Sequence, residues 1–220
     1  MIKVENIDVW GFEHAIRGMR NPMNSWNKSD SYQSDFTDDG KHGFVIGKND
    51  LDLMKKLCKS GPEHRKYLRQ IFVSMDITAP LYWWKEFDTY KVGTVANSCS
   101  TMHKIHAKEF EIGDFSTEHL ETLARFDEDG EMHQPYMVLK VVIDCLNACR
   151  NSYLQTKNKI DWWQMIQLLP SSYNQKRTIT LNYENVVIMI KQRSGHKLDE
   201  WNYLVTILTD LPYIKEIIKQ

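Results

Sequence analysis

The sequence predicts an α+β fold in a single domain spanning residues 1–220. Three short segments alternate apolar and polar residues as strands do, at residues 1–10, 68–78 and 176–182. Most of the remaining chain has helical periodicity. The order is strand, helix, loop, helix, strand, and then mostly helices with one late strand, which indicates the α+β class.

The composition supports one large domain and excludes several classes of protein. The chain has 220 residues, 42% of them hydrophobic, which is enough for a substantial core. Its 28 basic and 29 acidic residues leave a net charge of −1, so no overall field attracts nucleic acid or an anionic membrane. No apolar run reaches the ~18–20 residues needed to cross a bilayer. Four scattered cysteines without a Cys-x-x-Cys pair fit a reducing cytoplasm, so we expect a cytoplasmic protein.

The N-terminal part begins with a strand and a short helix. Residues 1–10 alternate Ile2 and Val4 with polar neighbours, as an edge strand does, and residues 11–21 are helical until Pro22. Residues 24–43 are rich in Ser, Asp, Asn and Gly, which predicts a long surface loop that is either functional or disordered.

A helix and a half-buried strand follow this loop. Residues 49–61 place their apolar side chains on one face, with Asn49 or Asp50 as the N-cap and Gly61 at the end. Residues 68–78 alternate apolar and polar side chains. Pro80 then stands where a new helix can begin.

Helices dominate the second half. Residues 114–126 read as an amphipathic helix, and residues 136–157 as a longer helix that should be mostly buried, because its polar residues form a single stripe. The remaining elements are helices at 162–170, 183–194 and 198–208 and a strand at 176–182.

Few common site motifs occur. His103 and His106 could share a helical face as metal ligands, but no third ligand has a compelling position, so we expect no metal site. The pairs Trp83–Trp84 and Trp162–Trp163 favour a core or a subunit interface over a stacking site for a cofactor. Arg193, near a helix end, can pair with a phosphate or with the helix dipole.

Three segments, taken together, resemble the flavin-dependent thymidylate synthases in order and separation. They are residues 53–87, 89–102 and 168–201. In the first, His64 falls where that family places a flavin-contacting histidine. In the third, Asn182 and Arg193 match the family's Asn and Arg without a gap.

The middle segment occupies the place of the family signature Arg-His-Arg-x-x-Ser-x-Asn-x-x-Ser-x-Arg-Tyr. Only Lys91 for Arg and Thr94 for Ser are chemically close to it. Thr89 and Thr101 stand at arginine positions, and an apolar residue near Ile166 replaces a further arginine. Each lost charge-assisted contact would remove roughly 1.5–3 kcal/mol of binding energy. The ordinary dUMP site is therefore not expected to be intact.

The resemblance implies a small, mainly antiparallel sheet packed with long helices, and a homotetramer that binds FAD and a nucleotide where subunits meet. Members of the family methylate dUMP, with methylenetetrahydrofolate as the carbon source and a reduced pyridine nucleotide such as NADPH as the hydride source. The implied flavin and phosphate ligands are His64, Lys91, Asn182 and Arg193. The implied substrate side holds Glu86, Asn97 and Cys99, and no residue is assigned as catalytic.

Two of these substrate-side residues carry a specific expectation. Glu86 stands where the family has a glutamine, and a carboxylate can only accept hydrogen bonds, which could favour a base with an amino group such as cytosine. Cys99 is not expected to act as a nucleophile, because the family's chemistry needs none from the enzyme.

The leading hypothesis is a divergent protein of this fold that uses FAD to modify a pyrimidine nucleotide. The alternative is a non-catalytic relative that binds a nucleotide or a protein partner. A third hypothesis is a standard thymidylate synthase whose site is rebuilt by residues of the 24–43 loop.

Overall fold

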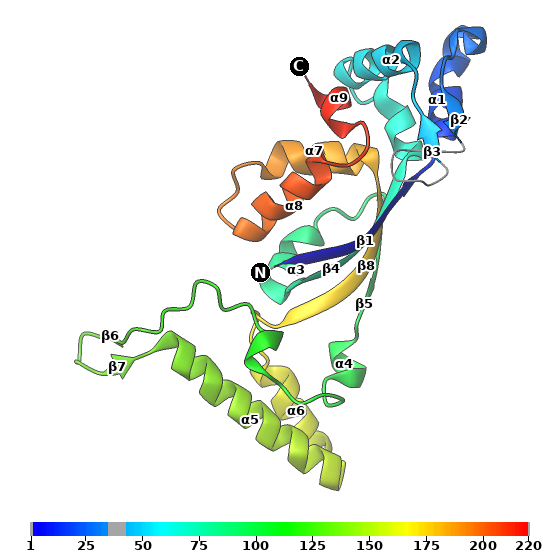
Figure 1. Cartoon of the computed structure of the whole chain (residues 1–220). Coiled ribbons are helices and arrows are strands. Elements are labelled where there is room, and N and C mark those ends of the chain that lie inside the picture. The colour runs from blue at the N-terminus through cyan, green and yellow to red at the C-terminus, as the bar shows by residue number, and fades with distance from the viewer. Residues whose placement is uncertain (1, 35–42, 220) are drawn as a thin grey trace. The chain divides into compact units, whose positions relative to one another are not determined.

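The computed structural model describes residues 2–34 and 43–219 and confirms the α+β class (Figure 1). Its main sheet is small and antiparallel in character, with the strand order β1-β4-β8-β5. These four strands are β1 (Lys3–Trp10), β4 (Phe72–Pro80), β5 (Thr94–Ser98) and β8 (Asn174–Asn182). Two short antiparallel hairpins pair β2 (Tyr32–Ser34) with β3 (Gly43–Val45) and β6 (Arg125–Phe126) with β7 (Met132–His133).

Helices make up most of the rest. The α-helices are α1 (Phe12–Arg20), α2 (Lys48–Lys59), α3 (Leu81–Phe87), α4 (Thr101–Lys104), α5 (Pro135–Thr156), α6 (Lys159–Leu168), α7 (Tyr183–Arg193), α8 (Asp199–Thr209) and α9 (Ile214–Ile218). Short 3-10 helices are η1 (Asn21–Met23), η2 (Trp26–Lys28), η3 (Arg65–Gln70) and η4 (Ile112–Asp114). Among the residues that the structure describes, no helix is both long and apolar enough to cross a membrane.

The chain divides into two compact units. Unit 1 consists of Met1–Lys3, Ile77–Thr89 and Asn97–Arg177. Unit 2 consists of Val4–Asp76, Tyr90–Ala96 and Thr178–Gln220. Each of the four strands of the main sheet contributes residues to both units.

The strand predictions agree with the structure. β1 lies at an edge of the sheet, as its alternation indicates. In β4, Val73, Met75 and Ile77 are buried and alternate with half-buried polar residues. The strand begins at Phe72 because the preceding residues form η3.

The helix predicted over residues 114–126 is wrong. Ser116 donates its backbone N–H to the carbonyl of Ser172 at 2.8 Å, and Phe115 forms a β-bridge with Tyr173. Phe115 is also buried in a core cluster with Phe110. These contacts with a distant segment hold the backbone extended, so the helical spacing of the apolar residues does not decide the structure.

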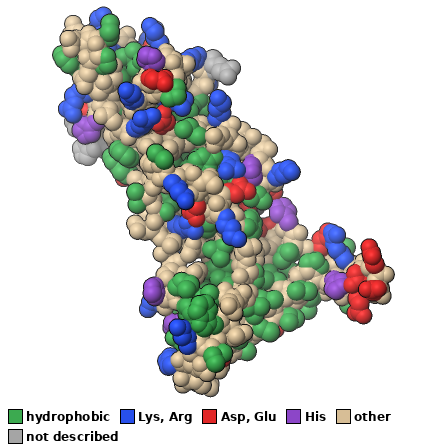
Figure 2. All heavy atoms as spheres, turned by 180° about the vertical axis from the view of Figure 1, so that it is seen from behind, with side chains coloured by type: hydrophobic (Ala, Val, Ile, Leu, Met, Phe, Trp, Pro, Cys, Tyr) green, Lys and Arg blue, Asp and Glu red, His purple; other side chains and the backbone are tan. Residues whose placement is uncertain are grey.

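The long helix is present as α5, but the prediction that it is mostly buried is wrong. Only Leu139, Ile143 and Leu146 are buried, on the side that packs against α6. Val138 and Val141 remain exposed. Figure 2 shows hydrophobic side chains gathered along this helix and acidic side chains at the tip of the adjoining β6–β7 hairpin.

The paired tryptophans have different environments. Trp83 and Trp84 of α3 are fully buried with ring centroids 4.9 Å apart, which confirms that this pair belongs to the core. Trp163 of α6 is 41% exposed, so the core interpretation does not hold for it.

The predicted loop at 24–43 is only partly a loop. Its first residues form η2 and β2, and residues 35–42 lie outside the described residues. Ser29 and Ser31 donate their hydroxyls to the carboxylate of Asp50, each at 2.7 Å. This segment is therefore fastened to the start of α2.

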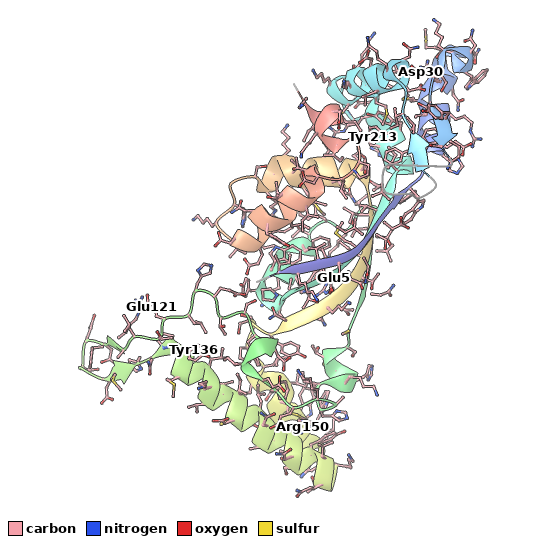
Figure 3. The ribbon with its side chains drawn as sticks, in the orientation of Figure 1. Glu5, Asp30, Glu121, Tyr136, Arg150 and Tyr213 are labelled. Carbon is pink, nitrogen blue, oxygen red and sulfur yellow. The ribbon has the colours of Figure 1, made fainter. Side chains whose placement is uncertain are left out.

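The predicted cap of α2 is also wrong. The N-cap is Gly47, which has no side chain to accept a hydrogen bond. Asp30 supplies the carboxylate instead, accepting the backbone N–H groups of Asn49 at 2.9 Å and Asp50 at 3.1 Å. Figure 3 shows Asp30 beside this helix. A carboxylate here satisfies free N–H groups and complements the positive end of the helix dipole.

Candidate functional site

The candidate site in unit 2 is built along α7, and we call its residues 90–94 and 182–193 the α7 strip. Asn182 caps α7 by accepting the N–H of Asn185 at 3.0 Å. The Asn185 amide in turn donates to the Val92 carbonyl at 2.8 Å and to the Thr94 hydroxyl at 3.0 Å. The residues around Lys91 are thus fastened to the first turn of α7, and the Lys91 side chain itself is exposed.

Gly93 makes this close approach possible. Its φ of +74° lies in the left-handed region, and a Cβ there would lie 2.5 Å from the Asn182 side-chain nitrogen. A side chain at this position would therefore both strain the backbone and push against the cap.

The other end of the α7 strip holds Arg193 in an aromatic setting. Its Nε donates to the Tyr90 hydroxyl at 2.9 Å, and its guanidinium lies 4.5 Å from the centroid of the Trp201 ring. His196 lies beside it, with Nε2 3.2 Å from Nη1. A half-buried guanidinium held against aromatic faces has a fixed direction, which suits recognition of a phosphate or of a carbonyl on a ring.

His64 precedes η3, which packs against α7. Arg65 and Arg69 of η3 both pair with Glu184 in the first turn of α7, and the Arg65–Glu184 distance is 3.1 Å. Burial by itself raises the pKa of Glu184, but the hydrogen bonds from the two arginines outweigh it and leave that pKa below its ordinary value. Glu184 is therefore charged at neutral pH, and its two ion pairs hold η3 against α7. His64 is exposed and immediately precedes η3.

The structure thus brings all four flavin candidates to α7 or to the segments fastened to it. Lys91 and Arg193 supply positive charge, and Asn182 supplies an amide. FAD carries two phosphates and ring carbonyls, so a set rich in N–H donors suits it chemically. The roles of these residues remain a prediction.

The three substrate-side candidates belong to unit 1. Glu86 lies half-buried in α3, whereas Asn97 and Cys99 are exposed in and just after β5. Cys99 is held through its backbone, because its N–H donates to Lys176 at 2.9 Å and its carbonyl accepts the Gln175 amide at 2.7 Å. Its thiol has no role in these contacts.

One cation in unit 1 was missed from the sequence. The Arg177 guanidinium lies 4.2 Å from the centroid of the buried Trp84 ring and pairs with Asp88 at 2.7 Å. Its Nε donates to Gln175 at 2.9 Å. The signal was a lone arginine in an alternating strand, which sequence alone does not distinguish from a solvated side chain.

The positions that lack the family's arginines have ordinary structural roles. Thr89 donates its hydroxyl to the Glu86 carbonyl at 2.7 Å, at the end of α3. Thr101 opens α4, and Ile166 packs against the core cluster of unit 1. Within the described residues, no group of three His, Cys, Asp or Glu side chains is arranged to hold a metal ion.

The fold is that of the flavin-dependent thymidylate synthases. No family sequence model and no curated protein matches the chain.

Two similar solved structures are flavin-dependent thymidylate synthase ThyX from Helicobacter pylori with FAD and dUMP. One has a TM-score of 0.65 at 17% identity over 98% of each chain. The other has a TM-score of 0.65 at 16% identity over 100% of each chain. A third is the UMP/dUMP methylase PolB from Streptomyces cacaoi bound with 5-Br dUMP, with a TM-score of 0.64 at 14% identity over 98% of this chain and 93% of that one. At these identities the likeness establishes the fold alone.

Proposed function

We propose that this protein binds FAD and modifies a pyrimidine nucleotide by transfer of a methyl or other one-carbon group. The observation that carries the proposal is the α7 strip on this fold. Asn182 and Arg193 lie at the two ends of α7, and the segment that contains Lys91 is hydrogen-bonded to the first turn of the helix. The similar structures are those of a thymidylate synthase solved with FAD and dUMP and of a methylase of UMP and dUMP.

In this proposal, the residues of the α7 strip bind and orient the flavin. Arg193, held by Tyr90 and Trp201, directs N–H donors at a phosphate or ring carbonyl, and Lys91 adds a mobile positive charge. The flavin, when bound, would carry a hydride from NADPH to the methylene group that methylenetetrahydrofolate supplies. Glu86 accepts a hydrogen bond from the base, which favours cytosine over uracil.

The second candidate function is nucleotide or protein binding without catalysis. Thr89, Thr101 and Ile166 favour it, because none of them supplies the charge of the arginines expected in the family. Thr89 and Ile166 are also engaged in local contacts of the chain itself.

Absorbance of the purified chain separates the two candidates. The enzyme proposal expects a yellow protein with bound flavin that bleaches when NADPH is added without oxygen, and faster when dUMP or dCMP is also present. A colourless protein whose unfolding temperature does not change with FAD would contradict flavin binding. Bound flavin that NADPH never reduces would instead support the non-catalytic candidate.

We also propose that the chain assembles as a homotetramer. The exposed apolar residues of α5, with Leu123, Phe126 and Met132 of the neighbouring hairpin region, form a surface that a monomer has no reason to expose. Light scattering should then give a mass four times the 26.0 kDa of one chain.

A further inference from the structure

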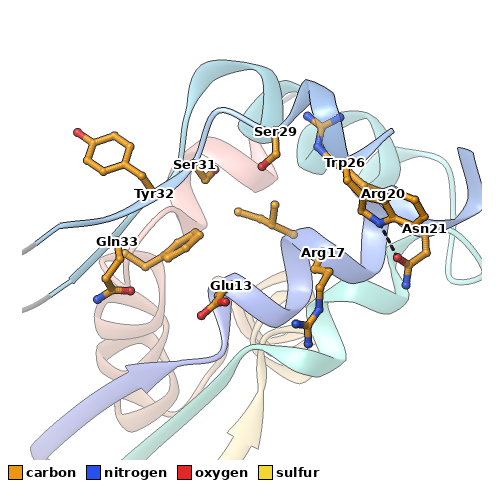
Figure 4. A pocket seen from close by; sticks show the side chains of 11 residues that line it. Glu13, Arg17, Arg20, Asn21, Trp26, Ser29, Ser31, Tyr32 and Gln33 are labelled. Atoms are coloured by element: carbon orange, nitrogen blue, oxygen red, sulfur yellow. Dashed lines mark hydrogen bonds between the residues drawn. The ribbon is translucent and has the colours of Figure 1, made fainter. Parts of the chain in front are cut away.

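Unit 2 has a cavity that contains none of the residues of the α7 strip. Its volume is about 740 Å³, within the range of small-molecule sites. α1 forms one wall, and the segment from Trp26 to Gln33 forms the opposite wall, as Figure 4 shows. The cavity is therefore large enough for a ligand with more than one ring.

Both walls are anchored at one buried carboxylate. Asp50, which is fully buried, accepts Arg20 Nε from the first wall at 2.6 Å. From the second wall it accepts the hydroxyls of Ser29 and Ser31 and two backbone N–H groups at 3.1 Å. The fold itself therefore fixes the two walls relative to each other, and binding of a ligand would require little reorganisation.

The charged groups of the lining offset one another. Arg20 is only 4% exposed, and its charge is paired with that of Asp50. Glu13 and Arg17 are exposed and of opposite sign, and the Arg17 guanidinium is directed away from the cavity, with Nη2 3.4 Å from His14 Nδ1 (Figure 4). A charged ligand would lose hydration here without gaining an ion pair to an unmatched charge, so the lining favours an uncharged ligand.

Several uncharged polar side chains of the lining already bind other groups of the protein. The Ser31 hydroxyl donates to Asp50 and accepts the backbone N–H of Gly47 at 3.0 Å. Asn21 Oδ1 accepts the indole N–H of Trp26 at 2.8 Å. A ligand would therefore be held mainly through apolar contacts.

The cavity supplies the aromatic and apolar surface for such contacts. Ile16 and Phe44 belong to its lining, and Phe44 is held in register opposite Gln33 in the β2–β3 hairpin. Trp26 is 52% exposed, and its hydrogen bond to Asn21 restrains the indole while leaving much of the ring accessible. Restrained aromatic rings stack well on flat aromatic partners.

We propose that this cavity binds an uncharged, flat aromatic ligand. Its ring system contacts Trp26 and Phe44, and its binding requires no ion pair with the protein. This inference is independent of the proposed flavin function, because the two sites share no residue.

Two fluorescent probes test the ligand class on the full-length chain. N-phenylnaphthylamine is uncharged, and anilinonaphthalene sulfonate has the same rings with one negative charge. We expect the uncharged probe to bind at least about fivefold more tightly, because the anion loses hydration without gaining an unmatched partner. Arg17→Gln should change neither affinity, because its guanidinium is directed away from the cavity.

Substitutions at Phe44 test whether the probe lies in the cavity. Phe44→Ala should weaken binding of the uncharged probe at least about fivefold, because it removes apolar contact area. Phe44→Leu keeps an apolar side chain and should retain most of the affinity. Tyr203→Ala, which removes an exposed aromatic side chain from α8 outside the cavity, is the matched control and should leave the affinity unchanged.

The NMR signal of Trp26 locates the probe without these substitutions. In protein labelled with fluorotryptophan, the fluorine signal of Trp26, assigned by its loss in Trp26→Phe, should shift saturably as N-phenylnaphthylamine is added. An anion that binds as tightly as the uncharged probe, equal affinities in Phe44→Ala and Tyr203→Ala, or an unshifted Trp26 signal would overturn the proposal. Loss of the shift on addition of FAD would overturn the claim of a separate site.

Discussion

Asp50 is the residue on which the N-terminal part of unit 2 depends. It is completely buried, and it joins α1, the segment at residues 29–31 and the start of α2 through hydrogen bonds from Arg20, Ser29 and Ser31. Hydrogen bonds from this many donors favour the charged form of a buried carboxylate.

Asp50→Asn should destabilise the protein by about 3–5 kcal/mol, because it leaves the buried Arg20 charge without its partner. Urea unfolding followed by circular dichroism measures this loss. Asp52→Asn, two residues further along α2 and exposed, is the control and should change stability by less than about 0.5 kcal/mol. Similar unfolding midpoints for the two variants would show that Asp50 does not hold these segments together.

Asp50 should also make the stability of the folded protein depend on pH. Burial alone raises the pKa of Asp50, but hydrogen bonds from Ser31, Ser29 and Arg20 outweigh it and hold the pKa below its ordinary value. The stabilisation is fully present above pH ~4, where an unfolded aspartate is also charged. It is lost as the pH falls further, because the unfolded chain then takes up the proton first. In unfolding titrations, wild type should lose stability more steeply than Asp50→Asn below pH ~4, and parallel curves would contradict this.

A substitution at Gly93 tests whether the contact between this residue and Asn182 matters for FAD binding. Gly93→Ala adds both backbone strain and a contact with Asn182, whereas Gly130→Ala, at φ +81° with open space around it, adds the strain alone. Each should cost about 1–2 kcal/mol from strain. Only Gly93→Ala should also weaken FAD binding, measured by flavin fluorescence quenching. Equal FAD affinities in the two variants would exclude a role for this contact.

At the scale of elements, sequence patterns identified most helices and strands but not the contacts that override them. The alternation in β4 and the periodicity of α7 are local and predict the structure correctly. Residues 114–126 have helical spacing too, yet the bridge between Phe115 and Tyr173 joins positions far apart in the chain. Local spacing contains no information about such pairing.

In the candidate site, too, the sequence indicated single residues but not the contacts between distant ones. The resemblance to the flavin-dependent thymidylate synthases indicated Asn182 and Arg193, and the structure places them at the two ends of α7. Tyr90 could not be linked to Arg193, because 103 residues separate them.

The exposed apolar face of α5 leads to a prediction about assembly of the chain. Val141 is 59% exposed, so Val141→Glu should change the stability of the isolated chain by no more than about 0.5 kcal/mol. If α5 forms the proposed interface, the new charge would be buried on assembly, and the mass in light scattering should fall below that of a tetramer. Gln155→Glu puts a carboxylate at an exposed polar position of the same helix and should leave the mass unchanged. An unchanged mass for Val141→Glu would exclude this face.

For the whole molecule, flavin binding should appear as a gain in stability. A ligand that binds only the folded chain, at about 100 times its dissociation constant, adds about 2.7 kcal/mol to unfolding. For a chain of this length this corresponds to a rise of about 5–11 °C in unfolding temperature.

Arg193→Gln removes a charged donor, so it should weaken FAD binding at least about tenfold and reduce the rise in unfolding temperature to about half. Lys191→Gln, in the same last turn of α7 and exposed, should keep the full rise. Each rise is measured against the same variant without FAD, which separates binding from any loss of packing between Arg193 and Trp201. Equal rises in the two variants would remove Arg193 from the flavin site while leaving flavin binding itself intact.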